Sequence, residues 1–107
     1  MNNLTKEEIK RYSRHLTLEE VGVSGQIKLK KASVLVIGCG GLGSPLLLYL
    51  AAAGIGTIGI VDNDVVEESN LQRQIIHNLE NINKKKIDSA EEAIKKLNPN
   101  INVEKYE

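Results

Sequence analysis

Continuous apolar stretches alternate with helical patterns over the last two thirds of the chain. Residues 33–37 and 57–61 are runs of aliphatic and β-branched side chains, typical of parallel strands buried on both faces. Residues 44–53 and 84–97 carry apolar positions at helical spacing, and residues 101–105 can form a third short strand. The order strand, helix, strand, helix, strand predicts an α/β fold, a Rossmann-like βαβαβ half of a doubly wound parallel sheet.

The beginning of the chain has a different pattern, which predicts helices ahead of the sheet. The run Thr5-Lys6-Glu7-Glu8 has capping-box spacing, so we expect a helix from Thr5 to about His15. Two glycines then interrupt the pattern before a short helix over residues 26–31. The expected organisation is an N-terminal helical segment over residues 1–32 and the Rossmann-like half over residues 33–107.

The predicted sheet is incomplete. Its first strand has an open edge at the place where the other half of a doubly wound sheet normally packs, and parallel sheets are seldom left uncovered. A chain of 107 residues holds one domain at most. Two explanations stay open: the sequence is the N-terminal portion of a longer protein, or oligomerisation covers the flank.

A glycine-rich turn follows the first predicted strand. Gly38, Gly40 and Gly43 fit G-x-G-x-x-G, in which the glycines permit a tight turn, a close approach of phosphate to the backbone, and packing of helix on strand. The phosphates would face the N-terminus of the following helix, where unpaired N–H groups favour an anion. Such turns also serve packing alone, so a purely structural role is the alternative.

Charge and composition narrow the possible partners and compartments. Fourteen basic and fourteen acidic side chains cancel, which gives no argument for a nucleic acid or a membrane surface as partner. The longest apolar run, residues 46–55, is shorter than the ~20 residues that cross a bilayer, and residues 1–10 lack a secretory apolar core. The single cysteine, Cys39, excludes an internal disulfide and a multi-cysteine zinc site. We therefore expect a cytoplasmic protein, or one of the plastid stroma, with no metal site of its own.

Asp62 ends the second predicted strand about twenty residues after the glycine turn, where a carboxylate can hold the ribose of either NAD or ATP. The polar segment from Ser69 to Gln74 follows, and it contains Arg73, an arginine that a simple NAD domain does not need. This arginine is placed to reach the phosphates. An NAD-dependent oxidoreductase half-domain remains one alternative. A nucleotide-binding module without catalysis is another.

Five motifs together resemble a known family. They are Gly38-x-Gly40-Gly41-Leu42-Gly43, Asp62-x-Asp64, Ser69-Asn70-Leu71-Gln72-Arg73-Gln74, Lys86, and Arg11-Tyr12-Ser13-Arg14-His15. The combination resembles the MoeB/ThiF family, relatives of the ubiquitin-activating E1 enzymes, and within it the molybdopterin-synthase adenylyltransferases. The resemblance implies an ATP-dependent adenylyltransferase that uses Mg²⁺. Its substrate would be the C-terminal glycine of a ubiquitin-like sulfur-carrier protein in molybdenum cofactor (molybdopterin) or thiamine biosynthesis.

The resemblance also implies roles for single residues. Arg73 and Lys86 are the cations that offset the charge on the phosphoryl oxygens as pyrophosphate leaves, and Arg14 reaches the site of a neighbouring subunit, which implies a homodimer. The other expected nucleotide-binding residues are Gly38, Gly40, Gly41, Gly43, Asp62, Asp64, Ser69, Asn70, Leu71 and Gln72. The magnesium-binding aspartate and the zinc-binding cysteines of longer relatives are expected beyond residue 107, so we expect a truncated or incomplete copy.

Several of these residues also have ordinary structural interpretations. Arg14 could solvate the first helix, Lys86 could belong to a solvated run of lysines, and Asp62 or Asp64 could cap a turn. His15 and His77 have no partners at metal-ligand spacing, which favours surface or local hydrogen-bonding roles. Cys39 is interpreted as a small residue of the loop. Its position near a helix N-terminus could lower the pKa of its thiol.

Overall fold

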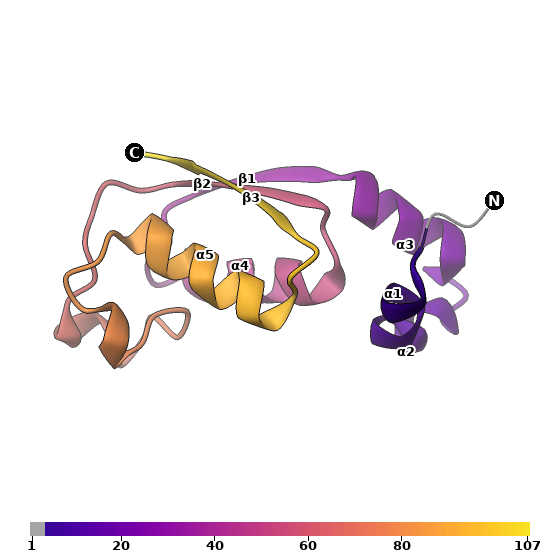
Figure 1. Cartoon of the computed structure of the whole chain (residues 1–107), viewed down its shortest axis with the longest axis horizontal. Helices are drawn as coiled ribbons and strands as arrows, with labels where there is room; N and C mark the ends of the chain where they lie inside the picture. Colours follow the sequence, from indigo (N-terminus) through magenta and orange to yellow (C-terminus); the bar gives the residue numbers. More distant parts are fainter. Residues whose placement is uncertain (1–3) are drawn as a thin grey trace.

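The computed structural model describes residues 4–107, which contain a three-stranded parallel sheet (Figure 1). The strands are β1 (Ser33–Ile37), β2 (Thr57–Val61) and β3 (Asn102–Tyr106), hydrogen-bonded in the order β1-β2-β3. Ser33 pairs with Thr57, and Thr57 with Asn102, so the strands begin at the same edge of the sheet. The α/β fold with an all-parallel sheet is thereby confirmed.

Two helices connect the strands and cover the same face of the sheet. They are α4 (Gly43–Ala53) and α5 (Lys86–Leu97), and both lie below the strands in Figure 1. Since each crossover between neighbouring parallel strands is right-handed and the strands advance in one direction, both helices reach the same side. The core lies between these layers, where Leu47 of α4, Ile58 and Ile60 of β2, and Ile94 of α5 are fully buried.

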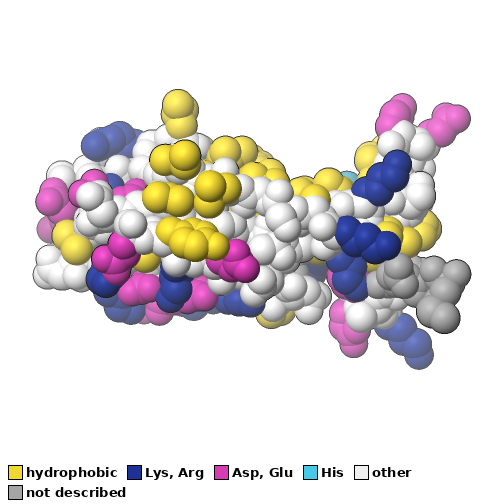
Figure 2. Space-filling view, turned by 90° about the horizontal axis from the view of Figure 1, so that it is seen from above, with side chains coloured by type: hydrophobic (Ala, Val, Ile, Leu, Met, Phe, Trp, Pro, Cys, Tyr) yellow, Lys and Arg dark blue, Asp and Glu magenta, His cyan; other side chains and the backbone are white. Residues whose placement is uncertain are grey.

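The opposite face of the sheet carries exposed apolar side chains. Figure 2 views the molecule from above and shows them gathered over the strands. Along β1, Val36 is buried on the helix side, whereas Leu35 and Ile37 are 58% and 80% exposed. The prediction that this strand is buried on both faces is therefore wrong for this chain, because both helices lie on one side and no other part of residues 4–107 covers the second.

Three helices precede the sheet: α1 (Lys6–Arg11), α2 (Ser13–Leu16) and α3 (Gly22–Lys31). The predicted capping box is present, since the Glu8 N–H donates to Thr5 Oγ1 at 3.1 Å and the Thr5 N–H donates to Glu8 Oε1 at 2.9 Å. The helix nevertheless ends before His15. Tyr12 interrupts it with φ −100° and ψ 17°, because its ring is buried and its hydroxyl accepts a hydrogen bond from Asn98 at 2.6 Å.

Other element bounds differ slightly from the prediction. Helix α3 begins at Gly22 rather than at residue 26, and α5 begins at Lys86 rather than at residue 84, because Lys85 is extended with ψ 137°. Strand β3 begins and ends one residue later than expected.

The connection from β2 to α5 lies beyond the carboxyl ends of the strands (Figure 1). It contains two short 3₁₀ helices, η1 (Glu68–Asn70) and η2 (Leu79–Asn81), and an isolated antiparallel bridge between Val65 and Lys85. Over residues 4–107, no helix has the length and apolar character needed to cross a bilayer.

Candidate nucleotide-binding site

The glycine turn folds back tightly between β1 and α4. Gly38 has φ +92°, a conformation that L side chains rarely adopt. A Cβ atom on Gly43 would lie 1.9 Å from the carbonyl oxygen of Gly38, so only glycine permits this close approach. The start of α4 is thus held directly against the end of β1.

The same turn presents a row of unpaired donors. The N–H groups of Gly40, Gly41, Leu42 and Gly43 have no hydrogen-bond acceptor anywhere in residues 4–107. Leu42, the N-cap residue of α4, offers no side-chain cap, and the first turn of the helix contains no acidic residue. The positive end of the helix dipole therefore faces an uncompensated position that suits an anion.

Asp62 follows β2 and is bonded to the glycine turn. Its Oδ2 accepts from the Cys39 N–H at 3.0 Å, and its Oδ1 accepts from the Asp64 N–H at 2.8 Å. Partial burial opposes ionisation of the carboxyl group, but these hydrogen bonds outweigh it and lower the pKa of Asp62. The carboxylate fixes the strand-to-loop turn, the structural role left open by the sequence, and retains lone pairs that can accept further hydroxyl donors.

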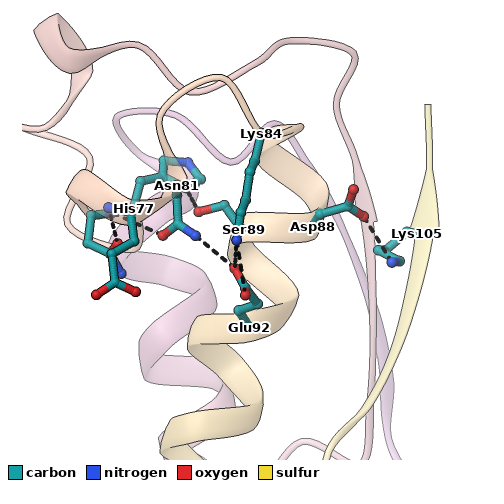
Figure 3. Close-up of polar contacts among 9 residues, drawn as sticks. His77, Asn81, Lys84, Asp88, Ser89, Glu92 and Lys105 are labelled. Carbon is teal, nitrogen blue, oxygen red and sulfur yellow. Dashed lines mark hydrogen bonds and ion pairs between the residues drawn. The ribbon is translucent and has the colours of Figure 1, made fainter.

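Lys86 is set apart from the two lysines that precede it. Its side chain is almost buried at the start of α5, and its Nζ lies 4.0 Å from Asp64 Oδ2. Its charge also influences the pKa of Asp62 and of Cys39 in the glycine turn. Lys84 instead lies exposed beside Glu92, 3.4 Å away (Figure 3), so the run of three lysines contains one inward-facing member.

The loop between β2 and α5 contributes less to the site formed by the glycine turn, Asp62 and Lys86. Arg73 is exposed, and its Nη1 donates to the Ser69 carbonyl oxygen at 3.2 Å. Asn70 Oδ1 accepts from the Glu67 N–H at 3.1 Å. Leu71 is half-buried and Gln72 is exposed. The segment meets the glycine turn at Gln74, whose amide nitrogen lies 3.5 Å from where a Gly40 Cβ would stand.

Arg14 lies at the end of the sheet opposite to the glycine turn. Its helix, α2, sits at the amino ends of the strands, where Tyr12 contacts Gly54 at the end of α4 and Arg11 donates to the Leu97 carbonyl oxygen at the end of α5. The structure therefore brings together the glycine turn, Asp62, Asp64 and Lys86, with Arg73 at the same end. It does not bring Arg14 to them within one chain.

Two buried polar residues beside the turn were not selected from the sequence. His77 is 5% exposed and hydrogen-bonded on both ring nitrogens, which confirms a local hydrogen-bonding role but not a surface one. Burial, assisted by the charge of Lys86, lowers the pKa of His77. Gln74 is also buried, and its Oε1 has no hydrogen-bond partner in the described chain. No spacing rule marks either residue, because their partners come from distant segments.

Cys39 is inert in this arrangement. Its side chain is fully buried, and burial together with the neighbouring Asp62 carboxylate raises the pKa of the thiol to about 12. The suggestion that the helix N-terminus lowers this pKa is wrong, because desolvation and a negative neighbour dominate. Cys39 is a small buried loop residue.

Residues 4–107 hold no group of three or more His, Cys, Asp or Glu side chains that could bind a metal ion. A zinc site built from such side chains alone is therefore not found among the described residues.

Comparison with known proteins finds similar sequences and similar solved structures over nearly the whole chain. The chain is 60% identical over 104 residues to the probable adenylyltransferase/sulfurtransferase MoeZ of Mycobacterium tuberculosis, covering 97% of this chain and 26% of MoeZ. The crystal structure of PaaA matches with a TM-score of 0.92 and 34% identity, over 99% of this chain and 35% of PaaA. Escherichia coli MccB in its structure with ATP matches with a TM-score of 0.81 and 36% identity, over 97% of this chain and 31% of MccB.

The chain spans about a quarter of the length of the curated relatives it matches. The model of the ThiF family matches residues 12–107, which is nearly the whole chain. The chain belongs to the ThiF family.

Proposed function

We propose that this chain binds ATP at the glycine turn and forms the nucleotide-binding part of an adenylyltransferase. The observation that carries the proposal is the row of unpaired N–H groups from Gly40 to Gly43 at the start of α4. Two relatives support it by name: MoeZ is a probable adenylyltransferase/sulfurtransferase, and MccB has a crystal structure with ATP.

In this proposal, the glycine turn holds phosphate oxygens and Asp62 accepts hydrogen bonds from the ribose hydroxyls. Ser69, Asn70, Leu71 and Gln72 line the approach to the phosphates, and Asp64 holds Lys86 in place. Lys86 is already desolvated, so its charge acts strongly on a nearby anion. Arg73 is exposed and would turn from the Ser69 carbonyl to grip phosphate oxygens with its planar guanidinium.

The proposed reaction is attack of a carboxylate oxygen on the α-phosphorus of ATP, which forms an acyl-adenylate and releases pyrophosphate. The carboxylate would be the C-terminal glycine of a ubiquitin-like sulfur carrier, in molybdopterin or thiamine biosynthesis. Negative charge on the phosphoryl oxygens must be offset as pyrophosphate leaves, which is the task of fixed N–H groups and cations. No step is assigned to Mg²⁺, which proteins usually bind through substrate phosphates together with one or two carboxylates.

Arg14 belongs to this proposal only through a second copy of the chain. It lies at the amino ends of the strands, away from its own glycine turn. In a homodimer, this arginine would enter the neighbouring copy's site.

Isothermal titration calorimetry with ATP and Mg²⁺, and separately with NADH, tests the proposal. NADH is the competing ligand because Asp62 could also hold the ribose of NAD. We expect ATP to bind with the higher affinity and Lys86→Met to weaken it by about tenfold or more, the scale of a lost charge-assisted hydrogen bond. The matched control is Lys84→Met, which removes an exposed charge two residues away and should leave ATP affinity unchanged.

Preference for NADH, or equal effects of the two lysine variants, would contradict the proposal. Carrier-dependent exchange of pyrophosphate into ATP then tests the enzymatic step. ATP binding without exchange, even in a protein extended to the length of its relatives, would support a binding module instead of an enzyme.

A further inference from the structure

His77 holds a defined position behind the glycine turn. Its Nε2 lies 3.0 Å from the carbonyl oxygen of Cys39, and its Nδ1 lies 2.6 Å from Ser89 Oγ in the first turns of α5. Figure 3 shows His77 beside Ser89, between the 76–84 loop and the helix. The ring thus joins the turn after β1 to α5.

We infer that His77 is a positioning residue that locks the Cys39–Gly40 peptide, so that the Gly40 N–H faces the anion position. The inference rests on the proposed function, because it assumes that an anion binds there. A trans peptide is planar, with its C=O and N–H pointing in opposite directions. Holding the Cys39 carbonyl inward on His77 therefore aims the following N–H outward.

The hydrogen-bond partners also determine the protonation state of the ring. A carbonyl oxygen can only accept, so Nε2 must carry the proton and donate to Cys39. Nδ1 then accepts from the Ser89 hydroxyl in the neutral ring. Burial and the charge of Lys86 both lower the pKa of His77 and favour this neutral form.

The turn needs such a lock because of its composition. Gly40 and Gly41 follow Cys39, and glycine peptides rotate between conformations at little cost. A rotated peptide would present the Cys39 carbonyl oxygen, in place of an N–H, to an incoming phosphate, and the two would repel each other. A second clamp lies next to the first, where the Ile76 N–H donates to Ser44 Oγ in α4 at 2.7 Å.

His77 is not placed to act on the ligand itself. The side chain is 5% exposed, and each ring nitrogen is occupied by a protein partner. Its effect passes through the orientation of one peptide. Loss of its Nε2 donor should therefore weaken ATP binding even where the fold is kept.

Two substitutions separate the two ring nitrogens. In His77→Gln the side-chain NH₂ can occupy the position of Nε2 and still donate to the Cys39 carbonyl oxygen. In His77→Asn the side-chain NH₂ occupies the position of Nδ1 and is too short to reach that oxygen. The control is His15→Asn, at a histidine whose Nδ1 bonds Gln26 Oε1 at 2.9 Å in the N-terminal helices. Circular dichroism establishes that each variant is folded.

The measurements are ATP affinity by calorimetry and the NMR spectrum of the 107-residue chain without ligand. We expect His77→Asn to weaken ATP binding by about tenfold, as for one lost hydrogen bond to a charged group, with His77→Gln and His15→Asn within about twofold of wild type. Long-range ¹H–¹⁵N spectra should show the Nε2–H tautomer. The Cys39 carbonyl and Gly40 amide signals should shift in His77→Asn much more than in His77→Gln.

Equal affinities for the Asn and Gln variants at position 77, or an Nδ1–H tautomer, would overturn the inference. Failure of the wild-type chain to bind ATP would overturn the proposed function instead. In that case the tautomer and the signals of the Cys39–Gly40 peptide still decide whether His77 locks the turn, because both are measured without ligand.

Discussion

Replacing Gly43 with alanine should destabilise the fold, because the structure leaves no room for a Cβ atom there. The new methyl group would lie 1.9 Å from the Gly38 carbonyl oxygen and 2.9 Å from its carbon, whereas real Cβ contacts essentially never fall below 3.0 Å. The first turn of α4 or the end of β1 must therefore move by about 1 Å. Overpacking of this kind costs about 1–3 kcal/mol, and the clash with backbone atoms places Gly43→Ala toward the upper end.

A compensating effect reduces this cost slightly. Alanine lowers the conformational entropy of the unfolded chain and stabilises by about 0.4–1 kcal/mol where the native conformation allows it. The net loss is then about 2 kcal/mol, which corresponds to a fall in Tm of roughly 10 °C for a domain of this size. Since the chain contains no tryptophan, urea and thermal unfolding are best followed by circular dichroism.

Gly41→Ala is the matched control in the same turn. A Cβ at this position meets nothing within 4 Å, and the residue has no positive φ. We expect this variant to be as stable as wild type, or slightly more so, through the effect on the unfolded chain. If Gly43→Ala unfolds within about 0.5 kcal/mol of Gly41→Ala, the reasoning from close approach is refuted, because 0.5 kcal/mol is the scale of an ordinary surface change.

Three further predictions concern buried and charged side chains. Cys39 should resist alkylation by iodoacetamide at pH 8 in the folded chain and react only in urea, since its pKa is raised to about 12; rapid native-state alkylation would contradict this. Asp62 has a lowered pKa, so the unfolded state binds more protons, and the stability that Asp62 contributes is lost as pH falls below the ordinary aspartate pKa of about 3.9 and through the lower folded pKa. In urea titrations, Asp62→Asn should be less stable than wild type at pH 7, and the gap should narrow below about pH 4; a gap independent of pH would refute the assignment. Lys30→Met should remove the 2.8 Å ion-pair partner of the buried Glu8 carboxylate and lower the free energy of unfolding by about 1–3 kcal/mol. Lys84→Met, the control, removes an exposed ion pair and should lower it by about 0–1 kcal/mol. Equal losses in the two variants would show that the burial of Glu8 is unimportant.

The strands and their connecting helices could be predicted because the hydrophobic pattern encodes them directly. Both β1 and β2 have the predicted bounds, and Gly54, the left-handed residue after α4 with φ +92°, ends that helix where expected. The exposure of one face of β1 could not be predicted in the same way. A continuous apolar run shows that a strand avoids water, but not which element covers each side.

The site residues were predictable to different degrees. The glycine turn could be predicted because its backbone conformation and close contacts require glycine, and the glycines are visible in the sequence. Lys86 faces inward because α5 begins at this residue. The run of three lysines does not by itself indicate at which lysine the helix begins. His77 was missed because it is hydrogen-bonded to Cys39, thirty-eight residues away, and to Ser89 in α5. Such contacts arise from the tertiary fold, which periodicity does not describe.

The central claim is that the unpaired backbone donors of the glycine turn bind phosphate. The most direct test is a titration of the ¹⁵N-labelled chain with ATP and Mg²⁺, followed by the amide signals of each residue. We predict saturable shifts that are largest at Gly40, Gly41, Leu42 and Gly43, with the amides of α1 unchanged. Saturable binding that leaves these four amides unmoved, or no binding at millimolar ATP, would contradict the account.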